Sequence, residues 1–145
     1  MYLLDTNVIS ELRHGKPQQS QAVRDWAADK EMSRLFLSAI TVLELEKGVQ
    51  ALERKLPPQG SALRDWLDRV KFAFADRILP FTQGTAVLCA GMHFPHPKPE
   101  RDAMIAATAL QHRMSLVTRN TADFENTGVA LINPFVDVAI APLLS

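Results

Sequence analysis

The sequence predicts one domain of the α/β class with a mainly parallel central sheet. Short apolar runs alternate along the chain with longer segments of helical periodicity, as in folds whose strands are joined by crossover helices. The runs are apolar throughout rather than alternating, which is typical of parallel strands covered on both faces. At 145 residues, 47% of them hydrophobic, the chain is long enough to bury one core. We therefore expect 1–145 to form a single domain.

Five of the short apolar runs are predicted strands. They are YLL at 2–4, LFL at 35–37, IL at 78–79, SLVT at 115–118 and ALI at 130–132.

Amphipathic helices are predicted between these runs. The clearest stripe has apolar residues at i, i+3, i+4, i+7 and i+11, namely Leu63, Trp66, Leu67, Val70 and Phe74. A second stripe spans 42–56 and a third spans 105–110, the latter introduced by Pro99, which suits a first helical turn. The segment LPPQGS around Pro58 is expected to be a mobile connection.

Composition restricts the class of protein. Cys89 is the only cysteine, which excludes an internal disulfide and fits a reducing cytosol. It lies in the apolar helical segment AVLCAGM and is expected to be a buried thiol, not a nucleophile. No segment approaches the ~20 apolar residues of a membrane-spanning helix, and no signal peptide is visible. We therefore expect a soluble, cytoplasmic protein with no membrane partner.

Net charge does not indicate a partner. The chain has 16 basic and 16 acidic residues, which by itself argues against a polyanionic ligand. The distribution matters more than the sum, because acids that bind cations at one site would leave the rest of the chain basic. Charge is therefore compatible with a nucleic acid but does not predict one.

Asp5 stands where the first predicted strand ends, within MYLLDTN. Ligands of a parallel α/β sheet bind at the carboxyl ends of its strands, which makes Asp5 a candidate for a binding site. Aspartate is also a favoured N-cap, so Asp5 is expected on structural grounds alone if a helix begins at NVISELR. The motif by itself does not decide between these two interpretations.

Glu44 belongs to the segment AITVLELEKGV, which follows the second predicted strand. The helix is expected to begin near Ser38 or Thr41, which places Glu44 in its first two turns. Glu46 lies on another face and is expected to be solvated. The residues on the face of Glu44 are small enough for another backbone to approach: Thr41, Gly48 and Ala51.

Two further acids occupy comparable positions. In PERDAMIAATAL, Asp102 lies in a first helical turn on the same face as Ile105, so it points inward, where a carboxylate must pair, protonate or bind a cation. Asp123 follows one turn after the strand that ends at Thr118, and Asn120 is expected to cap that turn. Asp123 also has a structural interpretation, since it would satisfy backbone donors there.

Each of these four acids follows a strand or opens a helix. Right-handed crossovers begin their helices at the edge where strands finish, so we expect Asp5, Glu44, Asp102 and Asp123 to meet there. Four carboxylates within a few ångströms repel and raise one another's pKa. A hard divalent cation removes this conflict, and Mg²⁺ or Mn²⁺ prefers such oxygen ligands. Zinc is not expected, because histidine and cysteine ligands are missing at suitable spacings.

Together these segments resemble a PIN domain. LLDTN at the start, TVLELEKGV with Glu44, DAMIAATAL with Asp102 and TRNTADF with Asp123 fit the family in order and spacing, over nearly the whole chain. In particular the chain resembles VapC-type toxins of bacterial toxin–antitoxin pairs, including the FitB-like branch. The resemblance implies a three-layer α/β/α fold with four to five short strands.

The resemblance also implies an activity and partners. The family's acids correspond here to Asp5, Glu44, Asp102 and Asp123, bind Mg²⁺ or Mn²⁺ and cleave RNA phosphodiester bonds. VapC-type toxins commonly form homodimers and are inhibited by a small antitoxin whose tail enters the active site. Arg101 would lie near the metal, where we expect it to face solvent rather than phosphate. The apolar ending NPFVDVAIAPLLS would pack on the domain or at a dimer contact.

On this hypothesis Asp5 and Asp102 are the closest metal ligands, and Thr118 orients a water or a ligand. Two alternatives remain open. A PIN-fold binding or regulatory module without activity usually lacks one or more of the acids, and all four are present. An aspartyl-phosphate transfer protein with Asp5 as nucleophile usually has a second Asp two residues on, where this chain has Asn7.

Overall fold

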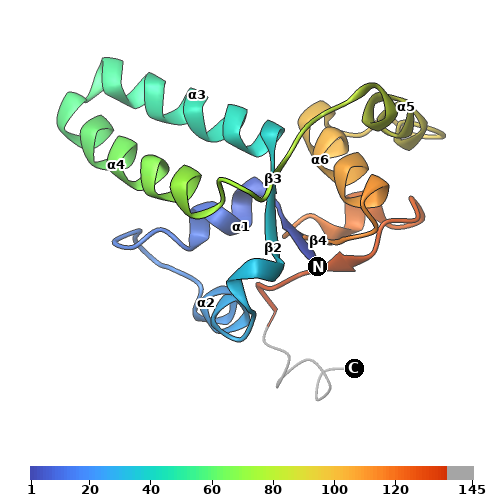
Figure 1. Ribbon diagram of the computed structural model, residues 1–145, viewed down its shortest axis with the longest axis horizontal. Coiled ribbons are helices and arrows are strands. Elements are labelled where there is room, and N and C mark those ends of the chain that lie inside the picture. The colour runs from blue at the N-terminus through green and yellow to red at the C-terminus, as the bar shows by residue number, and fades with distance from the viewer. Residues whose placement is uncertain (137–145) are drawn as a thin grey trace.

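The computed structural model describes residues 1–136 as a parallel five-stranded sheet with helices on both faces (Figure 1). The strand order is β3-β2-β1-β4-β5, so β1 lies in the centre. The strands are β1 (Tyr2–Leu4), β2 (Leu35–Ser38), β3 (Ile78–Leu79), β4 (Ser115–Val117) and β5 (Leu131–Ile132). The predicted α/β class, the three layers and the positions of all five strands are confirmed, with ends that differ by one residue at most.

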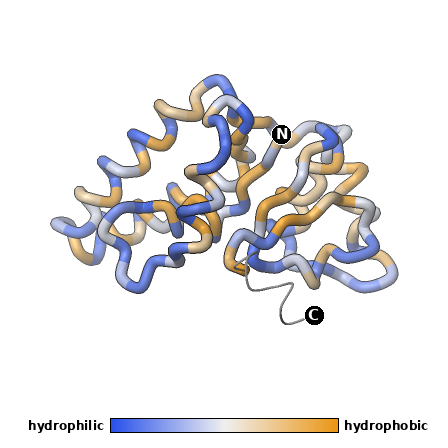
Figure 2. The backbone as a smooth tube through the Cα atoms, turned by 90° about the horizontal axis from the view of Figure 1, so that it is seen from below, coloured by the Kyte–Doolittle hydropathy of each residue, from blue (hydrophilic) through white to orange (hydrophobic). Residues whose placement is uncertain are grey.

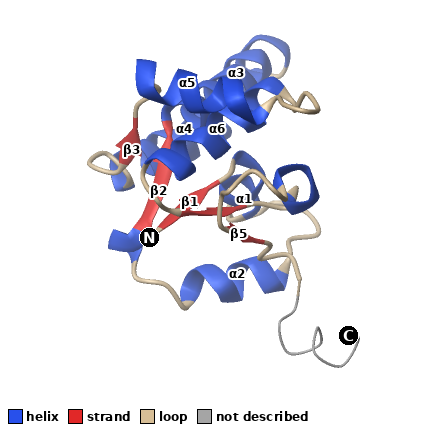
Figure 3. Ribbon diagram, turned by 90° about the vertical axis from the view of Figure 1, so that its right-hand side faces the viewer, coloured by secondary structure: helices blue, strands red, loops and turns tan. Residues whose placement is uncertain are grey.

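Helices connect the strands, and the strands lie between helical layers in Figure 3. No helix in the described range 1–136 is long and apolar enough to cross a bilayer. The helices are α1 (Thr6–Glu11), α2 (Gln21–Ala28), α3 (Ala39–Lys55), α4 (Pro57–Ala73), α5 (Gln83–Met92) and α6 (Glu100–Gln111), with 3₁₀ turns η1 (Met32–Arg34) and η2 (Thr121–Phe124).

The central strand β1 divides the core into two hydrophobic clusters. Leu3 and Leu4 are both fully buried but face opposite sides, because successive side chains of a strand alternate. Leu3 packs with apolar residues of α5 and α6, whereas Leu4 packs with those of α1 to α4. Cys89 is buried in the first cluster, and burial raises the pKa of its thiol, as predicted for an inert cysteine. Figure 2 shows the hydrophobic segments running through the interior.

Helices α3 and α4 form an antiparallel hairpin beside the sheet (Figure 1). Its close contact is at Gly60, where an added Cβ would lie 2.5 Å from the Glu53 Cα, and not at Gly48, which is exposed and has open space around it. The expectation that another backbone approaches the small residues beside Glu44 is therefore wrong at Gly48, but α1 does approach this face at the buried Thr41. The connection expected around Pro58 is also wrong, because α4 begins at Pro57, and proline is well accommodated in a first helical turn.

Glu46 was expected to be solvated but lies half-buried between the two helices of the hairpin. Both of its carboxylate oxygens accept from Arg64 Nη1, at 2.8 and 2.7 Å, and Lys71 Nζ lies 3.7 Å away. The Arg64 guanidinium lowers the pKa of Glu46, and it also pairs with Glu53. Periodicity within one helix does not predict this ion pair, because the pair links residues of two different helices.

The two glycines of the hairpin should respond to alanine in opposite directions. Gly60→Ala should destabilise the protein by about 1–3 kcal/mol, because the new methyl group meets the backbone of Glu53. Gly48→Ala should stabilise it by about 0.5–1 kcal/mol, because alanine loses less entropy in an exposed helix. Urea unfolding of both variants measures these changes. Equal effects of the two substitutions would contradict the proposed packing of Gly60 on α3.

Candidate active site

Asp5 follows the last residue of β1 and has a structural role besides any chemical one. It is the N-cap of α1, and its Oδ1 accepts a hydrogen bond of 2.8 Å from the Thr6 N–H. Its backbone N–H donates to the Val117 carbonyl at 2.9 Å, which joins the end of β1 to β4. The capping interpretation is therefore confirmed. Capping does not exclude that Asp5 also belongs to a binding site, because the other carboxylate oxygen, Oδ2, lies toward Thr118 at the end of β4.

Thr118 holds this second oxygen of Asp5. The fully buried Thr118 hydroxyl donates to Asp5 Oδ2 at 2.7 Å and accepts from the Asn120 N–H at 3.0 Å. Asn7 Nδ2 lies 3.4 Å from the same oxygen, and Asn7 Oδ1 accepts from the Arg119 N–H at 3.3 Å. Asp5 is only 3% exposed, and both of its carboxylate oxygens accept hydrogen bonds from the protein. The hydrogen bond between Asn7 and Arg119 also connects the loop after β4 to the start of α1.

Glu44 approaches the same edge from α3. Ser38 ends β2 and caps α3 by accepting from the Ile40 N–H at 3.0 Å, which confirms the predicted start of this helix. Glu44 then lies in the second turn, where the Thr6 hydroxyl donates to its Oε1 at 2.8 Å. The Thr6 hydroxyl also lies 3.2 Å from that of Thr41. Thr6 therefore links the first turn of α1 to the Glu44 carboxylate.

Asp102 occupies the first turn of α6, as predicted, and is half-buried. Burial is the main cause that raises its pKa, and the nearby carboxylates Asp5, Glu44 and Asp123 raise it further, to about 6. Burial also raises the pKa of Asp5, against the hydrogen bonds from Thr118 and the Thr6 N–H, and Glu44 adds to the increase. Asp5, Glu44 and Asp123 are therefore close enough to Asp102 to disfavour its ionisation.

Asp123 lies in η2 and differs from the other three acids. Its side chain is exposed and does not line the cavity between them, although its charge contributes to the raised pKa of Asp102. Asn120 precedes this turn but makes no side-chain capping hydrogen bond, so its expected capping role is wrong. The loop is organised instead by the Thr118 hydroxyl, which accepts from the Asn120 N–H.

A polar cavity of about 290 Å³ lies between these elements. Of the predicted site residues, Asp5, Glu44 and Asp102 line it, from β1, α3 and α6 respectively. The sequence reasoning missed its other polar side chains. They lie on one face of α1 and are Thr6, Asn7 and Ser10. Their hydroxyl and amide groups recur at helical spacing in the sequence, and this pattern could have predicted a polar face there.

Arg101 is the cation beside this cavity. It is exposed, as predicted, and its Nη1 lies 3.9 Å from Glu44 Oε2. A pair of this length between partly exposed groups stabilises the fold little, so the guanidinium remains available to an anion. The apolar ending that was expected to pack on the domain or at a dimer contact falls largely on 137–145, outside the described residues.

The donor groups of the cavity suit a hard cation in their chemistry. They are carboxylate and hydroxyl oxygens, which Mg²⁺ and Mn²⁺ prefer, and their mutual repulsion is what a bound cation relieves. Within the described residues 1–136, however, no three Asp, Glu, His or Cys side chains lie close enough together to hold one ion. Asp5 and Glu44 are instead engaged by the hydroxyl groups of Thr118 and Thr6.

Comparison with known proteins gives consistent results. Residues 2–130 match the family model described as PIN domain. The toxin FitB of Neisseria gonorrhoeae is 38% identical over 143 residues, which cover 94% of this chain and 100% of that protein. The VapC ribonuclease Y4jK of Sinorhizobium fredii is 35% identical over 144 residues, which cover 93% of this chain and 98% of that protein.

A solved structure supports the same similarity. A chain in the crystal structure of FitAcB from Neisseria gonorrhoeae superposes with a TM-score of 0.84 at 37% identity, covering 93% of this chain and 99% of that one. Since the match covers nearly the whole of both chains, the two proteins share the same fold.

The raised pKa of Asp102 predicts a pH-dependent cost to stability. The folded protein favours the protonated form of Asp102, so ionisation of this acid lowers the free energy of unfolding. This loss is absent below the ordinary pKa of 3.8, grows as the pH rises, and is complete above about pH 6. With a chelator present, Asp102→Asn should therefore be more stable than the unsubstituted protein at pH 7.5, and the difference should shrink at pH 4.5. Urea unfolding at the two pH values measures it.

The control for this comparison is Asp65→Asn, which removes an exposed carboxylate on α4 away from the cavity. It should leave the free energy of unfolding within about 0.5 kcal/mol at both pH values. A stability difference between Asp102→Asn and the unsubstituted protein that does not change with pH would show that burial and the neighbouring acids do not raise the pKa of Asp102.

Proposed function

This chain belongs to the PIN-domain family, and from that premise we propose that it is a metal-dependent endoribonuclease that acts as the toxin of a toxin–antitoxin pair. The observation that carries the proposal is the convergence of Asp5, Glu44 and Asp102, from three separate elements, on one polar cavity. The names of two relatives, a toxin and a VapC ribonuclease, support it.

In the proposed mechanism Asp5 and Asp102 are the closest metal ligands, and Glu44 and Asp123 complete the site directly or through water. When bound, Mg²⁺ or Mn²⁺ would lower the pKa of a water molecule and stabilise negative charge on the phosphate. Thr118 is a positioning residue, because its hydrogen bond orients Asp5 Oδ2. Hydrolysis proceeds without a covalent intermediate.

Other residues of the cavity prepare it for a phosphodiester. Thr6 orients the Glu44 carboxylate through the 2.8 Å hydrogen bond, and Ser10 offers a hydroxyl one turn further along α1. Arg101, at the rim, supplies a cation that can pair with phosphate in place of its long contact with Glu44. These side chains bind and orient the substrate around the scissile bond.

The two alternatives are less well supported. A silent PIN-fold module would have no use for three repelling carboxylates around a cavity, since their proximity raises the pKa of Asp102 and costs stability. An aspartyl-phosphate mechanism requires an accessible nucleophile. Asp5 is 3% exposed and both of its oxygens accept hydrogen bonds, which makes it a poor nucleophile.

The remaining proposals concern the setting in which the chain acts. We propose a cytoplasmic protein that forms a homodimer and is inhibited by a small cognate antitoxin bound at the active site. These features come from the resemblance to VapC-type toxins, and the name of the FitB relative, a toxin, agrees with that resemblance. The surface around the cavity selects the RNA that is cut, because single strands are recognised by surface shape and stacking.

Asp5→Asn tests the nuclease directly. The purified chain incubated with total cellular RNA and Mn²⁺ or Mg²⁺ should yield specific fragments. Asn at position 5 should reduce their rate of formation at least about 100-fold, because a metal ligand contributes several kcal/mol to catalysis. A chelator should abolish the fragments. Cleavage that persists in the Asp5→Asn protein would indicate a contaminating nuclease or a wrong assignment of this carboxylate.

Thr118→Val tests the positioning role. Valine keeps the shape but removes the hydroxyl from Asp5 Oδ2, so the cleavage rate should fall about 10- to 100-fold. Thr118→Ser retains the hydroxyl and should recover most of the rate. Metal titration followed by isothermal calorimetry should show weaker Mn²⁺ binding for the valine variant. Equal cleavage rates for Thr118→Val and Thr118→Ser would contradict the positioning role of the Thr118 hydroxyl.

A further inference from the structure

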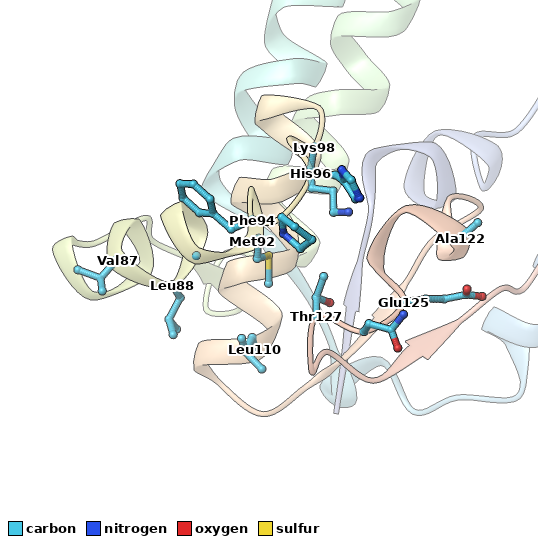
Figure 4. A pocket seen from close by; sticks show the side chains of 13 residues that line it. Val87, Leu88, Met92, Phe94, His96, Lys98, Leu110, Ala122, Glu125 and Thr127 are labelled. Atoms are coloured by element: carbon cyan, nitrogen blue, oxygen red, sulfur yellow. The ribbon is translucent and has the colours of Figure 1, made fainter.

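A second, larger cavity of about 630 Å³ lies beside the acidic one and shares none of its lining residues (Figure 4). Its walls come from α5, from the loop between α5 and α6, from the end of α6, and from η2 with the loop that follows it. Nothing in the mechanism described above uses it. Its composition is mixed, with apolar side chains on α5 and charged or amide side chains on the two loops.

The cavity adjoins the acidic site on two sides. Lys98 lines it and lies four residues before Asp102, separated from it by the start of α6. Ala122 also lines it, and the next residue, Asp123, is close enough to raise the pKa of Asp102. Residues that line this cavity are therefore near neighbours, along the chain, of two acids of the candidate site.

The apolar wall presents an exposed aromatic ring. Phe94 is 79% exposed and Val87 is 69% exposed, although both border a concave surface. Leu88 and Met92 continue the wall toward the interior. A planar base inserted here gains stacking on Phe94 and removes its ring from water, an interaction that every base can make.

The polar walls carry charges of both signs. In Figure 4 His96 and Lys98 lie together on the loop before α6, whereas Glu125 lies across the cavity. Among the described residues 1–136, neither Lys98 nor Glu125 has an ion-pair partner. A nucleotide complements this arrangement, because its phosphate suits the lysine and the amino or imino groups of its base suit a carboxylate.

We propose that this cavity binds one unpaired nucleobase of the RNA, next to the scissile phosphate, by stacking on Phe94. Lys98 contacts the adjoining phosphate, and Glu125 and Asn126 accept and donate hydrogen bonds at the base edge. This inference rests on the proposed ribonuclease function and deepens it, by making the substrate a single strand or loop at this position. A second copy of the chain is a less suitable occupant of this cavity, because the cores of protein–protein interfaces are depleted in charged residues such as Lys98 and Glu125.

The test measures RNA binding apart from cleavage. Fluorescence anisotropy of a fluorescein-labelled single-stranded RNA of mixed sequence gives the Kd, with Ca²⁺ present to neutralise the carboxylates and a gel to verify that the RNA stays intact. Phe94→Ala should raise the Kd at least about fivefold, whereas Phe94→Tyr should keep it within about twofold, because stacking needs only a ring. Lys98→Gln should raise the Kd and reduce its dependence on salt.

Matched controls are available on the α3–α4 hairpin. Phe72→Ala removes a phenylalanine that is 87% exposed on α4, and Lys55→Gln removes an exposed lysine at the end of α3. Neither residue lines the cavity, so both variants should bind as the unsubstituted chain does. In Mg²⁺ or Mn²⁺, Phe94→Ala should raise the KM for RNA cleavage with little change in kcat.

These measurements distinguish the proposed base-binding cavity from the proposed ribonuclease activity. RNA binding that depends on Phe94 without any cleavage would support the base site and contradict the proposed function. Cleavage with an unchanged Kd in Phe94→Ala would overturn the base site and leave the nuclease intact. If Phe94→Ala instead converts a dimer to a monomer in sedimentation, with unchanged RNA affinity per protomer, the cavity belongs to a protein contact and the inference is wrong.

Discussion

The candidate site depends on the hydrogen bond from Thr118 to the buried carboxylate of Asp5. It joins the end of β4 to the end of the central strand β1, and it leaves one Asp5 oxygen to cap α1. A buried carboxylate without such partners would protonate or destabilise the fold. Because Asp5 is held, α1 starts where Thr6 can reach Glu44 on α3, so one interaction sets the position of two of the acids.

The same arrangement carries a cost that only function explains. Burial and three neighbouring carboxylates raise the pKa of Asp102, so the protein folds against repulsion at neutral pH. Elsewhere the chain avoids such conflicts: Glu46 and Glu53 on the α3–α4 hairpin share Arg64. Repulsion concentrated at one sheet edge is expected of a site that binds a cation, or that binds an anion through a cation.

Much of the site was predictable because strand ends and first helical turns are local features. Asp5, Glu44 and Asp102 each follow a strand or open a helix, and the topology of a parallel sheet brings such positions to one edge. Asp123 was predicted for the same reason. It lies exposed in the 3₁₀ turn η2 and does not line the cavity, although its charge contributes to the raised pKa of Asp102. The polar face of α1 was overlooked because hydroxyl side chains near a cap have a structural explanation.

The sequence by itself determined the fold class, the strand positions and the identity of the acids, because hydrophobic periodicity and breaks in it are written along the chain. Only the tertiary structure decided which side chains touch. It paired Glu46 with Arg64, placed Gly60 rather than Gly48 at the close helix contact, and opened a cavity between Phe94 and Glu125. These contacts join residues of different elements, and their geometry arises only when the layers pack.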